Sequence, residues 1–115
     1  MLVGLTVGLA GVGLARAPAK SDHTDRAVSA QDVRAIFLRD CAVCHGADGR
    51  GTEQGPSLFH AGAAVVDFWL STGRMPLPSA GAEAVRRTPK YPPAVIHALV
   101  AYVAKLVIEG RRPFE

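Results

Sequence analysis

The sequence predicts an all-α protein in which three to four helices form one small domain. Apolar residues recur at helical spacing in three segments, residues 30–41, 61–71 and 93–108. Glycine- and proline-rich stretches separate these segments, and no run alternates apolar and polar residues as a half-buried strand does. A chain of 115 residues has room for one small domain and not for two.

Residues typical of helix ends mark the first and last of these segments. Ser29 is suited to be an N-cap, and Asp32 beyond it makes an acidic variant of the capping box. We expect the first helix to end near Cys41. In the last segment, Pro93 suits the first turn of a helix, and Gly110 is placed to cap the C-terminus.

The predicted core is poor in aromatic side chains. Hydrophobic residues make up 49% of the chain but aromatic residues only 6%, and a core of Ala, Val and Leu buries little surface at this size. In the second helix we expect Val65, Phe68 and Trp69 to face inward and Gly73 to stop the helix. A large apolar cofactor at the centre would supply the missing core.

The N-terminal segment resembles an export signal. Residues 2–15 are nearly all apolar or small, the length of a signal-peptide core and short of the roughly 20 residues that span a membrane. Ala15-Arg16-Ala17 is a small-x-small cleavage pattern. We therefore predict a signal peptide or N-terminal anchor (1–17), a polar linker (18–29), the main domain (30–110) and a short tail (111–115), located outside the cytoplasm or on the outer face of its membrane.

One short motif carries most of the chemistry. Cys41-Ala42-Val43-Cys44-His45 has the Cys-x-x-Cys-His pattern by which c-type haem is attached. Two thiols on one local turn can each add to a vinyl group at one edge of the porphyrin, and the following imidazole then projects toward the iron. We predict covalent haem c on Cys41 and Cys44, with His45 as an iron ligand.

Two other kinds of site use paired cysteines. A structural zinc site needs four ligands, and the second pair would have to come from His23, His60 or His97, at no recognisable spacing. A thioredoxin-like dithiol belongs near a βαβ pattern, and the sequence has none. Both alternatives remain open at this point, and haem attachment is favoured.

Met75 is the predicted second axial ligand. It is the only methionine besides Met1 and stands before Pro76, after the second helix. A neutral, soft thioether raises the reduction potential of a haem iron, and two retained ligands favour electron transfer over oxygen chemistry. The alternatives are that Met75 fills the core or that His60 takes its place as ligand.

Pro56 is the predicted partner of the histidine ligand. A ligating imidazole usually donates its other N–H group to a carbonyl or carboxylate, and the rigid Pro56 could present its carbonyl to His45 at fixed geometry. An ordinary turn is the alternative. Arg74 and Tyr91 are further candidates, as partners of the haem propionates.

These motifs, in this order, resemble class I cytochrome c over roughly residues 32–107. The matching runs are Cys41–His45, Gly-Pro56-Ser-Leu, Thr-Gly-Arg-Met75-Pro and Leu99-Val-Ala-Tyr102-Val. The resemblance implies an all-α cytochrome c fold around one haem, with Phe37 packed against Leu99 and Tyr102 where the first and last helices cross. Val33 departs from the pattern, because a small residue is usual there, and implies a looser crossing or a shifted register.

A closer resemblance is to the haem domains of the cytochrome c subunit of actinobacterial menaquinol–cytochrome c reductase, the bcc complex. It rests on three runs: Gly55-Pro-Ser-Leu-Phe, Gly62-Ala-Ala-Val-Val-Asp-Phe and Thr72-Gly-Arg-Met-Pro-Leu. That family implies two haems and a C-terminal membrane helix. This chain has one haem motif, as expected of a single-haem relative or of one piece of a longer protein.

The predicted function is one-electron transfer by a His/Met-ligated haem c in an extracytoplasmic respiratory chain. The chain would be an electron carrier and not an enzyme, without a small-molecule substrate. Its partners would be redox proteins (a quinol–cytochrome c reductase, an oxidase or a dehydrogenase), with membrane anchoring possible through residues 2–15. A net charge of +3 argues against a nucleic-acid partner. The alternatives are a haem subunit fed by a periplasmic dehydrogenase and a haem-based gas or redox sensor with a labile sixth ligand.

Overall fold

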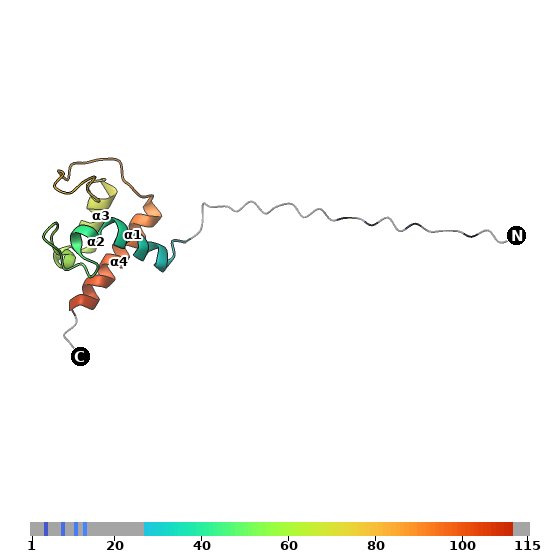
Figure 1. The fold of residues 1–115 in the computed structure, drawn as a ribbon, viewed down its shortest axis with the longest axis horizontal. Helices are drawn as coiled ribbons and strands as arrows, with labels where there is room; N and C mark the ends of the chain where they lie inside the picture. The colour runs from blue at the N-terminus through green and yellow to red at the C-terminus, as the bar shows by residue number, and fades with distance from the viewer. Residues whose placement is uncertain (1–3, 5–7, 9–10, 12, 14–26, 112–115) are drawn as a thin grey trace.

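Four α-helices and one short 3₁₀ helix make up the part of the chain that the computed structural model describes, residues 27–111 together with Gly4, Gly8, Gly11 and Gly13. The elements are α1 (Ala30–Asp40), α2 (Ala42–His45), η1 (Leu58–His60), α3 (Ala63–Ser71) and α4 (Pro93–Arg111), and these residues contain no strand (Figure 1). The all-α prediction is therefore confirmed. The predicted signal peptide or anchor, most of the linker and the tail lie largely outside the described residues.

The predicted N-cap fixes the start of α1. The Ser29 hydroxyl accepts a hydrogen bond from the backbone N–H of Asp32 at 3.1 Å. The same hydroxyl donates to the Asp32 carboxylate at 2.6 Å. A helix begins where its first N–H groups, which have no partner within the helix, find one outside it.

The core forms where α1 crosses α4. Phe37 is fully buried and Leu99 is 1% exposed. The ring of Phe37 lies 5.0 Å from that of Tyr102, as the resemblance implies. Val33 is buried in the same cluster, so this crossing accommodates a branched side chain where a small residue is usual.

The second predicted helix needs two corrections. Residues 61 and 62 lie outside it, because α3 begins at Ala63 after the separate turn η1. Phe68 does not face inward: it is 49% exposed, and the guanidinium of Arg74 lies over its ring, 5.3 Å from the centroid. Neighbouring helix positions point about 100° apart, so Phe68 and Trp69 do not share a face.

Gly110 does not cap α4, contrary to the prediction, and the helix continues to Arg111. The reason is packing: a Cβ atom on Gly110 would lie 2.3 Å from Cζ of Phe59. Arg50 completes this contact, since its guanidinium lies 5.0 Å from the Phe59 ring centroid and donates to the Gly110 carbonyl at 3.1 Å. Because Gly110 has no side chain, the ring of Phe59 can pack directly against α4.

Within the described residues, α4 is the one helix long and apolar enough to cross a membrane by length and composition. It is also the central helix of the domain. Ile96, Leu99, Val103 and Val107 are buried in the core, and the helix packs against α1, α3 and η1. A core helix passes the same test as a membrane span, and packing accounts for its apolar face here.

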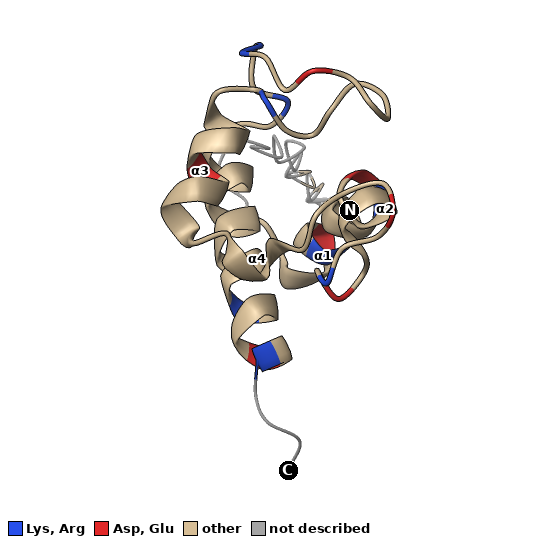
Figure 2. Ribbon diagram, turned by 90° about the vertical axis from the view of Figure 1, so that its left-hand side faces the viewer, with Lys and Arg blue, Asp and Glu red and all other residues tan. Residues whose placement is uncertain are grey.

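Charged residues are dispersed over the described part of the chain. Figure 2 shows both Lys and Arg positions and Asp and Glu positions on loops and on helices, with neither sign confined to one element. Part of this charge has an internal role: in the loop between α3 and α4, the Arg87 side chain donates to the carbonyls of Glu83 and Val85. That loop is tied to the end of α3 by the backbone bond from Arg87 to Thr72, 3.0 Å long.

Candidate functional site

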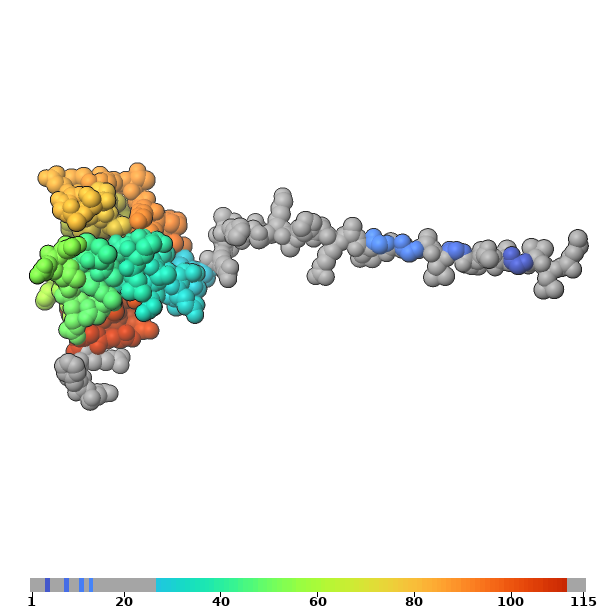
Figure 3. All heavy atoms as spheres, in the orientation of Figure 1, coloured from blue at the N-terminus to red at the C-terminus, as the bar shows by residue number. Residues whose placement is uncertain are grey.

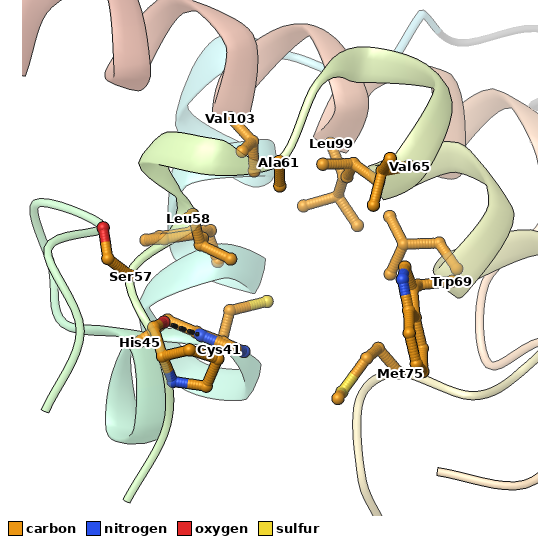
Figure 4. Close-up of a pocket in the computed structure, with 14 residues that line it drawn as sticks. Cys41, His45, Ser57, Leu58, Ala61, Val65, Trp69, Met75, Leu99 and Val103 are labelled. Atoms are coloured by element: carbon orange, nitrogen blue, oxygen red, sulfur yellow. Dashed lines mark hydrogen bonds between the residues drawn. The ribbon is translucent and has the colours of Figure 1, made fainter. Parts of the chain in front are cut away.

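The candidate site is an apolar cavity of about 310 Å³ enclosed by residues from every described helix. Phe37, Leu99 and Val103 come from the crossing of α1 and α4, and Val65 and Trp69 from α3. Figure 4 shows His45 and Cys41 on one side of the cavity and Met75 and Trp69 on the other. The remaining lining residues are Pro56, Ser57, Leu58, Ala61, Val66 and Leu70.

His45, the last residue of α2, is oriented by one hydrogen bond. Its Nδ1 atom lies 2.7 Å from the carbonyl oxygen of Pro56 (Figure 4). A carbonyl can only accept, so Nδ1 carries the proton in this contact. The lone pair of the neutral ring is then on Nε2, the arrangement typical of a metal-ligating histidine. The structure thus brings the two residues together as the sequence predicted.

The two cysteines come just before His45 in the chain: Cys41 lies between α1 and α2, and Cys44 lies within α2. Both thiols are free and half-buried. Burial, with a smaller contribution from the Asp40 charge, raises the pKa of Cys41 to about 11. A reactive dithiol has a lowered pKa, so this environment does not support the thioredoxin-like alternative. The described residues also contain no cluster of three His, Cys, Asp or Glu side chains that could hold a zinc ion.

Met75 is held opposite His45 by the end of α3. The backbone N–H groups of Arg74 and Met75 both donate to the Trp69 carbonyl, at 3.0 and 3.1 Å. These bonds turn the chain back over the helix end, and they place the thioether next to the Trp69 ring (Figure 4). Met75 is partly buried and packs against the core cluster, with its sulfur available to the cavity.

A second cavity, of about 230 Å³, continues the first toward the surface. Both cavities are lined by Cys41, His45, Pro56, Leu70 and Met75, and the second adds Cys44, Val43 and Leu77. In Figure 3 the segment around the cysteines (green) and the segment after α3 (yellow to orange) meet along a boundary on this face. The site is therefore a partly open crevice that runs between these two segments.

Asp40, which the sequence reading did not single out, anchors the loop that follows Met75. Its side chain is 8% exposed and accepts hydrogen bonds from the Tyr91 hydroxyl and from Arg39, with Lys90 at 3.2 Å. The Arg39 hydrogen bond is the main reason why the pKa of Asp40 lies well below its usual range. Burial and the Asp40 bond raise the pKa of Tyr91. Only the fold brings Asp40 and Tyr91 together, so no local pattern marks this pair.

Three sequence candidates lie away from the cavity. The Arg74 guanidinium donates to the Ala84 carbonyl at 3.2 Å, and Arg74 is not among the lining residues. His60, at the end of η1, and His97, on α4, are exposed and line neither cavity. The imidazole of His60 is therefore not placed to replace Met75.

Comparison with known proteins places this arrangement in a family. The Cytochrome c family model matches residues 30–106, from the first residue of α1 into the last turns of α4. The chain belongs to the cytochrome c family. This cytochrome c binds haem c covalently as its cofactor, and electron transfer through that haem is its function.

The chain is also similar to a group of larger actinobacterial proteins, each named cytochrome bc1 complex cytochrome c subunit. It is 40% identical to the protein of Mycobacterium tuberculosis over 108 residues, which cover 90% of this chain and 38% of that protein. Identity is 36% to the Corynebacterium efficiens protein over 108 residues, 87% of this chain and 36% of the relative. The chain is also 36% identical to the Mycobacterium leprae protein over 106 residues, which cover 90% of this chain and 37% of that protein. The chain spans little more than a third of the length of these relatives.

The residues present fit a haem c. The cavity lining is largely apolar and includes Cys41, His45 and Met75, three of the residues that the cofactor requires. An imidazole with a free Nε2 faces a thioether across the cavity, and two free thiols lie beside the imidazole. An apolar cavity with one open edge is the environment of a cofactor that exchanges electrons with partners at its rim.

Proposed function

We propose that this cytochrome c domain transfers single electrons within a respiratory quinol–cytochrome c reductase, on the extracytoplasmic side of the membrane. In this proposal Cys41 and Cys44 would bind haem c covalently, His45 and Met75 would hold its iron, and Pro56 would orient His45. When bound, the haem supplies one-electron chemistry, its iron alternating between ferric and ferrous.

One observation carries the ligand assignment. His45 and Met75 lie on opposite sides of a single apolar cavity, although they come from different helices and loops. The Pro56 carbonyl, 2.7 Å from Nδ1, leaves Nε2 for the metal. The thioether of Met75 is a soft, neutral ligand, and backbone bonds to Trp69 hold its segment in place.

The chain's contribution to electron transfer is to keep this geometry unchanged in both oxidation states. The core residues Phe37 and Leu99 line the cavity and exclude water from it. Ligands that stay in place limit the reorganisation that accompanies each transfer. Val43, 70% exposed between the two cysteines, and Leu77 border the open edge, where a redox partner would approach.

The names of the relatives support the respiratory assignment. Each is called a cytochrome c subunit of a bc1 complex. The extracytoplasmic side follows from the signal-like residues 2–15 together with the haem c motif. A redox protein of the same assembly or an oxidase is then the expected electron partner.

An optical spectrum tests the proposal. We expect the protein, expressed with a haem c maturation system, to show the sharp ferrous bands of low-spin haem c and a weak red-edge ferric band from methionine sulfur. Rapid binding of carbon monoxide by the ferrous protein at neutral pH would contradict the carrier and favour a sensor with an open site.

The attachment has its own test. The double variant Cys41→Ala/Cys44→Ala should lose haem on denaturing electrophoresis, whereas Val43→Ala, which changes an exposed residue between the two thiols, should retain it. Haem that stays with the double variant would refute attachment through these cysteines.

A further inference from the structure

We infer that Thr52 is a positioning residue for the histidine ligand, acting through the turn that presents the Pro56 carbonyl. This inference rests on the proposed function and extends it to a residue outside the haem cavity. Thr52 is exposed and lines neither cavity. Its effect would therefore be indirect, through hydrogen bonds.

Thr52 links the haem-attachment segment to the turn before Pro56. Its hydroxyl donates to the Cys44 carbonyl at 2.7 Å. The same oxygen accepts from the backbone N–H of Gln54 at 3.0 Å. The Thr52 N–H donates to the Gly55 carbonyl, also at 3.0 Å. One residue thus closes the turn 52–55 and fastens it to Cys44.

Gly55 lets this turn lie directly against the attachment segment. A Cβ atom on Gly55 would lie 2.8 Å from the carbonyl oxygen of Cys44 and 2.9 Å from its Cβ atom. No larger residue fits this contact without moving the turn. Pro56 follows immediately, so the distance between turn and Cys44 also sets the distance between the Pro56 carbonyl and His45.

The arrangement is a closed ring of contacts. Cys44 and His45 are neighbours in the chain, and the His45 ring is hydrogen-bonded to the Pro56 carbonyl at 2.7 Å. The backbone of the turn leads from Pro56 back to Thr52, whose hydroxyl donates to the Cys44 carbonyl and so completes the ring. A second bond, from the Gly51 N–H to the His45 carbonyl at 2.8 Å, braces the same segment. Loss of the Thr52 hydroxyl would remove the bond that joins the turn to the Cys44 carbonyl.

The consequence is chemical as well as structural. A hydrogen bond from Nδ1 to a carbonyl makes an imidazole a stronger electron donor to its metal. A stronger donor stabilises the ferric state and lowers the reduction potential. Loosening the Pro56 contact by way of Thr52 should therefore raise the potential, although Thr52 touches neither ligand.

The test compares Thr52→Val with Thr52→Ser in the haem-loaded protein. Valine keeps the shape and removes the hydroxyl, and serine restores the hydroxyl. In the valine variant we expect the His45 Nδ1 proton, followed by NMR, to exchange with solvent roughly tenfold faster. We also expect a higher reduction potential in that variant, and serine should restore both quantities.

Two further variants separate positioning from general destabilisation. Gly55→Ala pushes the turn away from Cys44 and should shift both quantities in the same direction as Thr52→Val. Thr72→Val removes a similar hydroxyl-to-carbonyl bond, 2.6 Å long, at the end of α3, and should leave Nδ1 exchange unchanged.

Different experimental results would refute the positioning role of Thr52 and the proposed function of the protein. Unchanged exchange and potential in Thr52→Val and Gly55→Ala would overturn the positioning role, as would equal shifts in the serine and valine variants. A wild-type protein without a low-spin haem c spectrum would instead refute the proposed function.

Discussion

The two sides of the haem crevice are built differently. On the His45 side, backbone bonds join residues close in sequence: Gly51 N–H to the His45 carbonyl and Leu58 N–H to the Gly49 carbonyl, each 2.8 Å. On the Met75 side, the loop of residues 76–92 is held largely by side chains, namely Arg74 and Arg87 donating to loop carbonyls and Tyr91 donating to Asp40.

The difference shows how each ligand is secured. The His45 segment is short, glycine-rich and bonded to itself, so its geometry depends on local sequence. The Met75 segment relies on the end of α3 and on contacts between residues far apart in the chain. We therefore expect the Met75 side to open first under stress, because long-range side-chain contacts are lost before a locally bonded turn.

Replacing the proposed ligand Met75 should have the largest effect. Met75→Ala should lower the reduction potential by a shift on the order of tenths of a volt, within the roughly 0.8 V range that axial ligands span, while the haem stays attached. The physical reason is that a thioether ligand favours the ferrous state. A potentiometric titration measures the shift.

His60→Ala is the matched control, because His60 is exposed and lies outside both cavities. Its potential should equal that of the wild type. A potential that changes in His60→Ala and stays unchanged in Met75→Ala would exchange the two assignments.

The substitution Gly110→Ala, near the end of α4, has two opposing effects on stability, one through helix propensity and one through packing. Alanine is favoured over glycine within a helix by about 1 kcal/mol, but its Cβ would lie 2.3 Å from Cζ of Phe59. Arg50 covers that ring, which therefore has little room to move. We expect a net destabilisation of about 1–3 kcal/mol, measured by denaturant unfolding of the haem-loaded protein.

A second substitution locates the cause. Shortening the ring in Phe59→Leu/Gly110→Ala should recover part of the loss seen with Gly110→Ala alone, as expected for residues in direct contact. An increase in stability in Gly110→Ala would mean that propensity outweighs the clash.

Replacing Asp40, which anchors the loop of residues 76–92, should have a smaller effect on the stability of the protein, and this effect should depend on pH. The pKa of Asp40 is lowered in the folded protein, chiefly by its bond with Arg39, so its contribution is present above the unfolded pKa near 4 and is lost as the pH falls below it. Asp40→Asn should therefore be less stable than the wild type by about 1 kcal/mol at pH 7, and this difference should narrow progressively as the pH falls from about 4 toward the lowered pKa of the folded protein.

Asp48→Asn is the control for that measurement. Asp48 lies 3.4 Å from Arg50 with 63% of its side chain exposed, and an exposed ion pair contributes about 0–1 kcal/mol. Denaturant unfolding at several pH values should show almost no difference from the wild type. If the stability of both variants depended on pH to the same extent, Asp40 would have no special role in anchoring the loop.

Much of the fold was predictable because its signals are local. The Ser29 cap and the 3.6-residue spacing of apolar residues require only neighbours in the chain, and α1 begins where they indicate. The errors arose where distant residues meet. Gly110 has the pattern of a helix cap in the sequence, but its role is decided by contact with Phe59.

The sequence by itself indicated haem c as the cofactor, because the proposed attachment residues Cys41 and Cys44 and the proposed ligand His45 form one short motif, and it pointed to Pro56 and Met75 as their proposed partners. The tertiary structure alone decided that His45 and Met75 share one cavity, that Asp40 holds Tyr91, and that Thr52 fastens the Pro56 turn to Cys44. The reason is physical. Bonding within a turn depends on neighbouring residues, whereas a shared cavity and a hydrogen bond between residues far apart in the chain depend on how separate helices and loops pack.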